Sequence, residues 1–250
     1  MGLLVVNWNG KLERYYLSNR FLQNLRLPPR PQRHHYRLQC VPKQGKRYFL
    51  RLRHNVRSLE VMRNSILRKK PVGIFFTPTE WLDPIYLRKT RKAQNLDVLL
   101  SSPLYFDIDY TSLNPPTIRN AATQTRKIAI AINSLFGRQP DWICFTGRKD
   151  FHLYYWDWDN IPSMFPRPSD RMRESIRRRQ VLSEDLRKRE AKFDVQVTSD
   201  PFRIMRLPGS LHSETMQPVM ILDIQRFLGD TLLAWRSAFC VALVTVTWSA

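Results

Sequence analysis

The chain has 250 residues, of which 43% are hydrophobic and 12% aromatic, a composition that excludes an intrinsically disordered protein. Its formal net charge of +20 exceeds what solubility requires and indicates a polyanionic partner, most often nucleic acid. Residues 1–100 carry 21 Lys and Arg against 5 acids, a charge of +16, and residues 101–250 carry only +4. A basic surface for membrane lipid is the alternative, but the sequence offers no basic amphipathic anchor for it.

The three cysteines, Cys40, Cys144 and Cys240, are far apart in the sequence and form no Cys-x-x-Cys pair. This spacing predicts neither a disulfide framework nor a zinc site, and it favours a reducing compartment. We therefore expect a cytoplasmic protein, at the nucleoid or a replication site. The residues at the start lack the basic region of a signal peptide. The apolar tail from Ser237 has 14 residues, whereas a bilayer requires about 20, so we expect no membrane partner.

The secondary structure that we predict mixes strands with interposed helices. Residues 26–31 form a proline-rich, stiff connector. Strands are predicted at 35–38, 47–53, 72–76, 104–110, 142–145, 151–156 and 193–197, the first two with a positive outward face. Helices are predicted at 117–136, with Gly137 as the stop, and at 171–192. This order indicates an α+β domain.

The helix predicted at 171–192 contains three consecutive arginines, at 177–179. These arginines are candidates for nucleic-acid contacts. The alternative is a solvated helix with ion pairs between residues four apart.

Asp107 and Asp109 lie two residues apart on the strand predicted at 104–110, so both side chains project from the same face. Strand geometry separates them by roughly 6–7 Å. Such a pair suits Mg²⁺ or Mn²⁺, which take carboxylate and phosphate oxygens. Asp is disfavoured inside strands, yet two interrupt an otherwise apolar run. Nucleases, phosphatases and glycosyltransferases also use Asp-x-Asp, and two solvent-facing acids are the structural alternative.

The turn at 146–150 places Thr146, Arg148 and Lys149 between the two strands of a predicted hairpin. A hydroxyl, free backbone donors and two cations within five residues suit a triphosphate. His152 follows on the returning strand, where it is placed to donate to a phosphate oxygen. An ordinary half-buried histidine is the alternative.

A third group of polar residues follows in the segment 194–212. Asp194, in a short apolar strand, is placed to complete a metal site. The Pro-Gly turn at 208–209 is expected to present Ser210 and His212 close to Arg206, which makes an anion pocket. A loop with surface cations is the alternative.

The order of these motifs resembles the catalytic subunit of archaeo-eukaryotic primases. The motifs are Phe-Asp-Ile-Asp at 106–109, Thr-Gly-Arg-Lys-Asp-Phe-His at 146–152, Asp-Val-Gln-Val-Thr-Ser-Asp at 194–200 and Arg-Leu-Pro-Gly-Ser-Leu-His at 206–212. In that family, motif I is Asp-x-Asp, motif II is Ser-Gly-Arg-x-x-x-His, and motif III is an Asp upstream of a basic, His-containing loop. The resemblance spans about residues 100–215.

Carried over by position, Asp107, Asp109 and Asp194 match the catalytic, metal-binding carboxylates. The nucleotide-binding set that residues and resemblance together predict is Thr146, Arg148, Lys149, His152, Arg206, Ser210 and His212. Thr146 stands where the family usually has Ser and keeps the hydroxyl. Asp150 replaces a common glycine and adds a negative charge near the phosphates.

The resemblance implies an α+β, mixed-sheet primase-polymerase fold with an RRM-like catalytic core. We expect no zinc-binding insert, as in a compact mobile-element, viral or bacterial relative. Residues 1–230 are predicted to form one catalytic domain, with 1–100 as its basic half and 101–230 carrying the motifs. Residues 231–250 are predicted to form an apolar tail, which either docks a second primase subunit or replication protein or closes the core.

The implied activity is DNA-templated addition of nucleoside triphosphates to a strand, with two Mg²⁺ or Mn²⁺ ions as cofactors. The expected partners are a single-stranded DNA template, a primer and nucleoside triphosphates. Two other functions remain open: a metal-dependent nuclease or phosphodiesterase, and a non-catalytic nucleic-acid-binding module on the same fold. The sequence does not distinguish priming from primer extension, or ribonucleotides from deoxynucleotides.

Overall fold

The computed structural model describes residues 8–42, 46–87, 98–109, 118–158 and 165–229. The helices are α1 (Trp8–Leu17), α2 (Asn19–Asn24), the 3₁₀ helix η1 (Pro31–Arg33), α3 (Leu59–Lys69), α4 (Ile118–Phe136), α6 (Pro168–Lys188), α7 (Val195–Ser199) and α8 (Ile224–Gly229). The strands are β1 (Tyr36–Cys40), β2 (Tyr48–Arg51), β3 (Gly73–Phe76), β4 (Glu80–Trp81), β5 (Leu99–Ser101), β6 (Leu104–Ile108), β7 (Trp142–Phe145), β8 (Phe151–Tyr155), β9 (Met205–Arg206) and β10 (Met220–Ile221).

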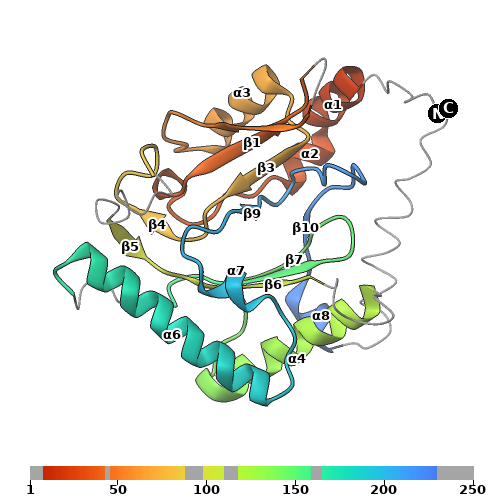
Figure 1. Cartoon of the computed structure of the whole chain (residues 1–250). Helices are drawn as coiled ribbons and strands as arrows, with labels where there is room; N and C mark the ends of the chain where they lie inside the picture. Colours follow the sequence, from red (N-terminus) through yellow and green to blue (C-terminus); the bar gives the residue numbers. More distant parts are fainter. Residues whose placement is uncertain (1–7, 43–45, 88–97, 110–117, 159–164, 230–250) are drawn as a thin grey trace.

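Two four-stranded sheets make up the centre of the molecule (Figure 1). The first has the order β2-β1-β3-β9 and the second has the order β10-β7-β8-β6. In Figure 1, α1, α2 and α3 lie beside the first sheet, and α4 and α6 lie on the far side of the second. The expected α+β fold is confirmed. Every strand pair among the described residues is antiparallel, so the sheets are less mixed than the resemblance implied.

The second sheet has one face buried under helices, as the sequence alternation predicts. On β6, Leu104, Phe106 and Ile108 are buried in a core that also contains Ile128 and Ile132 of α4. This burial follows from the period of two along a strand and of 3.6 along a helix. The other face of β6 therefore carries the odd-numbered residues, including Asp107, and Asp109 follows directly after the strand.

The helix α4 ends where the sequence predicts. Gly137 adopts a φ of +64° after the last helical residue, and its N–H donates to the carbonyl of Asn133 at 2.8 Å. Glycine adopts this left-handed conformation without the strain that a Cβ causes. The helix therefore stops at this point, and the chain returns as β7.

The first sheet has one apolar and one basic face. Tyr36, Leu38 and Cys40 of β1 are buried, whereas the alternate residues are partly exposed. Across the sheet, Arg37 of β1 pairs in register with Arg51 of β2. The predicted positive outward face of these strands is thereby confirmed.

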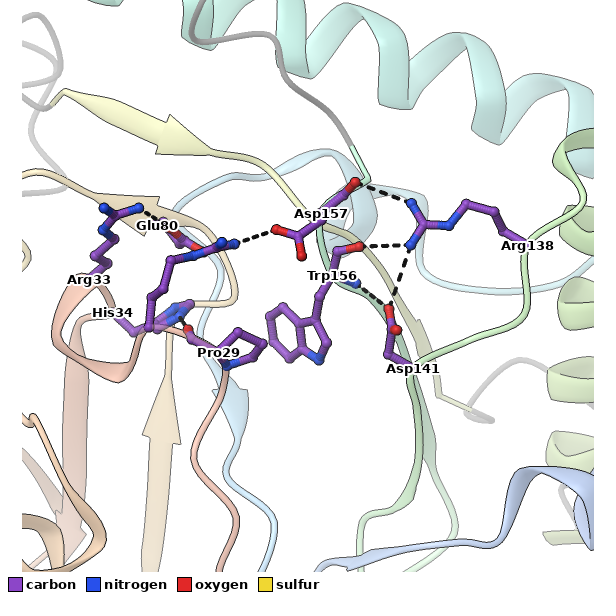
Figure 2. A network of polar contacts seen from close by, with 9 residues as sticks. Pro29, Arg33, His34, Glu80, Arg138, Asp141, Trp156 and Asp157 are labelled. Atoms are coloured by element: carbon purple, nitrogen blue, oxygen red, sulfur yellow. Dashed lines mark hydrogen bonds and ion pairs between the residues drawn. The ribbon is translucent and has the colours of Figure 1, made fainter.

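An ion network joins the two halves of the chain where the sheets approach each other (Figure 2). Glu80 of β4 is buried, and its carboxylate accepts from Arg30 at 2.7 Å and from Arg33 at 3.2 Å. The same Arg30 side chain donates to Asp157, which follows β8. Arg138 donates to the backbone carbonyl of Asp157 at 3.2 Å. The network therefore links the segment before β1 and the strand β4 to the end of β8.

The long helix α6 shows what its arginine triplet does. Arg177 and Arg178 pair with Glu174 at 2.7 and 2.8 Å, which is the solvated-helix alternative. Arg179 is buried and donates to the carbonyl of Pro103 at 2.6 Å, while its guanidinium lies 4.6 Å from the centre of the Tyr105 ring. Arg179 is therefore part of the packing between α6 and the second sheet.

Two further features concern membrane spans and cysteines. No helix within the described residues is both long and apolar enough to span a bilayer. Cys40 and Cys144 are free, buried thiols. Cys240 and the tail at 231–250 lie outside the described residues.

Candidate active site

Asp107 and Asp109 lie at the end of β6, on the face opposite the apolar core. Asp107 pairs in register with His152 of β8, and its Oδ1 lies 3.6 Å from His152 Nε2. The Tyr154 hydroxyl lies 3.3 Å from His152 Nδ1. If the hydroxyl donates there, the neutral ring carries its proton on Nε2 and directs it toward Asp107. Burial and the nearby Arg206 guanidinium lower the pKa of His152 to about 3, so the ring is neutral at physiological pH.

The carboxylates at this site repel one another. Burial raises the pKa of Asp107 to about 7, and the negative charges of Asp109 and Asp194 contribute to the rise. Burial and the neighbouring Asp109 likewise raise the pKa of Asp150. A cluster of acids with raised pKa values is typical of a functional site, because the repulsion is relieved when a cation binds.

The turn between β7 and β8 carries two cations, one of which pairs with these acids and the other with Glu214. Lys149 Nζ lies 3.0 Å from Asp109, and Arg148 pairs with Glu214 at 2.7 Å. Gly147 has a φ of +88°, and a Cβ at this position would lie 2.7 Å from the carbonyl oxygen of Gln217. Only glycine therefore permits this close approach of the turn to the following loop.

That following loop, residues 207–217, carries the third motif. Thr215 donates to the carbonyl of Gly147 at 2.7 Å, which ties the two loops together. His212 Nδ1 lies 3.3 Å from the Glu214 N–H and accepts from it, so Nε2 carries the proton of the neutral ring. Burial and the charge of Arg206 lower the pKa of His212 to about 4.

Asp194 does not lie in a strand, contrary to the prediction for residues 193–197. Its side chain accepts from the Val197 N–H at 3.0 Å and so caps the N-terminus of α7. An aspartate at this position satisfies a helix N–H that otherwise has no partner. Its backbone N–H donates to the carbonyl of Asp107 at 2.9 Å. Asp194 therefore lies beside the aspartate pair, as expected, but its carboxylate is already engaged in the cap.

Several buried polar atoms in the motif residues and in β1 have no hydrogen-bond partner among the described residues. They are Gln39 Oε1, Thr146 Oγ1, Asp150 Oδ1, Arg206 Nη1 and Ser210 Oγ. Buried polar atoms are nearly always paired, so a group of unpaired ones requires an explanation. Two hydroxyls and a guanidinium are donors for anionic oxygens such as those of phosphate.

The fit of the site to a divalent cation is partial. Within the described part of the chain, no three His, Cys, Asp or Glu side chains are arranged to hold a metal ion. Asp107 and Asp109 nevertheless share one face. Mg²⁺ is commonly bound by one or two carboxylates together with substrate phosphates and water. The pair therefore fits a cation that arrives with a triphosphate better than a cation held by protein alone.

Sequence reasoning missed two kinds of contributor. Glu214 pairs with Arg148, Phe75 of β3 contacts Arg206, and Gly73 leaves room for the Arg206 guanidinium because it has no Cβ. Gly73 and Phe75 lie far from Arg206 in the sequence, and Glu214 lies just beyond the motif at 206–212, so no motif includes them. The alternation of β3 signals only that Gly73 and Phe75 share a face.

Comparisons with known proteins agree with this architecture. The sequence matches no protein-family model and no curated protein. The structure is similar to the polymerase domain of Mycobacterium tuberculosis ligase D in complex with DNA, with a TM-score of 0.60 and 11% identity over 92% of this chain and 88% of that chain.

Two weaker similarities are to primases. The AEP domain of the primase-polymerase of cyanophage S-2L is 15% identical, with a TM-score of 0.40 over 82% of this chain and 88% of that chain. The catalytic domain of primase RepB′ in complex with initiator DNA is 11% identical, with a TM-score of 0.41 over 94% of this chain and 98% of that chain.

The similarity to the ligase D polymerase domain covers nearly the whole of both chains. The protein therefore has the archaeo-eukaryotic primase-polymerase fold, as its motifs predict. The fold assigns a class of architecture, and the chemistry has to be argued from the site.

Proposed function

We propose that this protein is a DNA-templated nucleotidyltransferase, a primase or primase-polymerase. The observation that carries the proposal is that an acidic pair and unpaired hydrogen-bond donors occur together at one site. Asp107 and Asp109 form an acidic pair, and unpaired donors of Thr146, Arg206 and Ser210 lie in the loops and strand around it. A nucleoside triphosphate with its divalent cations matches both features, because phosphate accepts from the donors and the cations bind the acids.

Each predicted residue has a role consistent with its position. Asp107 and Asp109 are the residues that would hold the divalent ions, with Asp194 beside them. If two Mg²⁺ or Mn²⁺ ions were held by these carboxylates, they would supply positive charge for activating a primer 3′-oxygen and for neutralising the triphosphate and its leaving group. Four groups bind phosphate oxygens and stabilise their charge: Arg148, Lys149, Arg206 and the Nε2–H of His212.

Before a nucleotide binds, two of the cationic side chains are held by acidic side chains of the protein. Lys149 rests on Asp109, and Arg148 rests on Glu214. Both pairs are partly exposed, so their net contribution to stability is small and a triphosphate displaces the acids at little cost. Neutral His152 and His212 act as donors without adding charge.

The basic face of the first sheet supports DNA as the template. Arg47 precedes β2, and Phe49 and Arg51 follow on the same face by strand alternation. The Phe49 side chain is 48% exposed. Cations that follow a backbone and aromatic rings that stack on bases are the two features by which proteins bind single strands.

A synthesis assay on single-stranded DNA tests the proposal. Wild-type protein is incubated with template, with or without a labelled primer, with Mg²⁺ or Mn²⁺ and with ribo- or deoxynucleoside triphosphates. The Asp107→Asn/Asp109→Asn variant is compared with Asp185→Asn, which changes an exposed aspartate on α6. We expect the double variant to lose at least about 100-fold in rate, because charge stabilisation is removed, and the control to keep wild-type activity.

The outcomes separate the competing functions. Product that the wild type forms and the double variant does not form supports the proposal, and product without primer identifies a primase. Shortening of the labelled strand without triphosphate would instead identify a nuclease. Tight template binding without product under any condition would leave a binding module, and either result overturns the proposal.

A further inference from the structure

Arg206 is held against β3 by contacts that involve no acceptor. Its strand, β9, pairs with β3 so that Arg206 lies opposite Phe75. The guanidinium carbon lies 4.7 Å from the centre of the Phe75 ring, within the range of a cation–π interaction. Arg206 Nη1 is buried, and no described residue accepts from it. The guanidinium is therefore positioned by the ring, and an N–H remains available for another acceptor.

The space for this guanidinium exists because residue 73 is glycine. A Cβ on Gly73 would lie 3.2 Å from Arg206 Nη1 and 3.2 Å from Gln39 Oε1. Both distances are shorter than ordinary van der Waals contact. The φ of Gly73 is not among the positive values of this chain. Backbone freedom is therefore not the reason for glycine here, and the absence of a side chain is.

The charged groups around Arg206 distinguish it from the other two cations of the site. The acids that act on it most strongly are Asp150 and Glu214, followed by Asp107, and Arg47 is the nearby cation. None of these acids forms an ion pair with Arg206 among the described residues, whereas Arg148 and Lys149 each have one. Arg206 thus differs from the other two cations, because it is oriented without an anion of the protein.

We propose that Gly73 and Phe75 are positioning residues that hold Arg206 ready for the phosphates of the incoming nucleotide. This inference rests on the proposed function and extends it to β3, outside the three motifs. A guanidinium already oriented on a ring loses little freedom when it binds phosphate. The two residues act through Arg206 and need not touch the nucleotide.

The first test is Gly73→Ala, compared with Gly10→Ala. A Cβ on Gly10, in α1, meets nothing within 4 Å. At Gly73 the added methyl would first meet side-chain atoms rather than backbone, namely Arg206 Nη1, Gln39 Oε1 and Phe75 Cε2, each at 3.2 Å. We therefore expect the variant to fold, with a melting temperature close to that of the wild type. We expect Gly73→Ala to weaken binding of ATP, dATP and inorganic tripolyphosphate, with Mn²⁺ present, by the same roughly 3- to 30-fold, the range expected when a cation–π interaction is removed. The Gly10→Ala control should bind all three like the wild type.

A second test shows whether the effect passes through Arg206. We expect Gly73→Ala to have no further effect in an Arg206→Ala background, because residues that act through one shared partner are not additive. Phe75→Leu should raise KM for the triphosphate more than it lowers kcat, and Phe75→Tyr, which keeps the ring, should restore KM. Melting temperatures identify any variant that fails to fold, and Gly73→Ala then decides alone.

The failures are distinguishable. If wild-type protein binds no triphosphate and makes no product, the proposed function is wrong, and this inference with it. If the wild type is active but Gly73→Ala binds tripolyphosphate normally, only the positioning role is overturned. The same holds if Gly73→Ala weakens binding equally with and without Arg206.

Discussion

The two central sheets carry opposite charges in different surroundings. The first sheet pairs Arg37 with Arg51 on a partly exposed face, and the second places Asp107 on an inner face beside Asp109 and Asp194. Like charges near solvent are screened and cost little. The Asp107 side chain is only 17% exposed, so burial, together with less screened like charges, raises its pKa to about 7. The acidic face therefore lowers the stability of the folded state. A destabilising arrangement without a structural benefit indicates a functional site.

The largest stability effect that this comparison predicts is at Asp107. Its pKa is raised from 3.8 to about 7, so the ionised form destabilises the folded state at pH 8. We expect Asp107→Asn to raise the free energy of unfolding by about 2–3 kcal/mol, part of what that shift represents, when no divalent ion is present. Denaturant unfolding with a chelator measures this.

The control for that measurement is Asp185→Asn. Asp185 pairs with Arg189 at 3.2 Å on the exposed face of α6. Removal of a solvent-exposed ion pair changes stability by no more than about 1 kcal/mol. If Asp107→Asn were the more destabilising of the two variants, the acidic face would be a stabilising network and the comparison between the sheets would fail.

A buried histidine beside the basic face predicts that the protein becomes less stable as the pH falls. His35 precedes β1; its Nδ1 donates to the carbonyl of Pro84 at 2.8 Å, and its Nε2 accepts from Arg37 at 3.1 Å. The ring is therefore neutral, and burial lowers its pKa to about 4. Because the folded pKa lies below the unfolded value of 6.5, stability falls as pH decreases from about 6.5 toward 4.

His35→Gln isolates this contribution. Between pH 7 and pH 5, the wild type should lose about 1–2 kcal/mol more than the variant, within what the pKa difference allows. Unfolding curves at each pH measure the difference. Other buried histidines contribute to the acid sensitivity of both proteins alike, so parallel curves for the two proteins would show that His35 titrates normally.

The sequence predicts β6, β7 and β8 of the second sheet because their signals are local, whereas the two-residue strand β10 is not predicted. The alternation of apolar residues in β6 and β8 and the 3.6 period of α4 depend only on neighbouring residues. The strand predicted at 193–197 is wrong, because a short apolar run fits a strand or a buried helical turn equally. The side chain of Asp194 decides between them by capping α7. Aspartate is a common N-cap residue. Within a short apolar run, however, an aspartate does not by itself distinguish the start of a helix from a strand.

The candidate site divides in the same way. The shared face of Asp107 and Asp109 follows from strand geometry, and the turn at 146–150 follows from its glycine and charges. The contact of Arg206 with Phe75 could not be predicted, because β9 and β3 are far apart in the sequence and their register depends on the whole sheet. Likewise, the sequence does not show that Arg179 is buried, because the other two arginines of the triplet pair with Glu174 on the helix surface.

The smallest expected effect is at the basic face itself. Arg47→Ala/Arg51→Ala removes two cations from the edge formed by β2, and we expect little change in unfolding free energy. Single-stranded DNA affinity should fall, and its dependence on salt should weaken by roughly 0.7 in the logarithmic slope for each phosphate that the two arginines no longer neutralise. Fluorescence anisotropy over a range of salt concentrations measures both quantities. Arg177→Ala is the matched control, because this exposed arginine pairs with Glu174 on α6. An equal loss of affinity in the control would mean that the DNA follows overall charge rather than the first sheet.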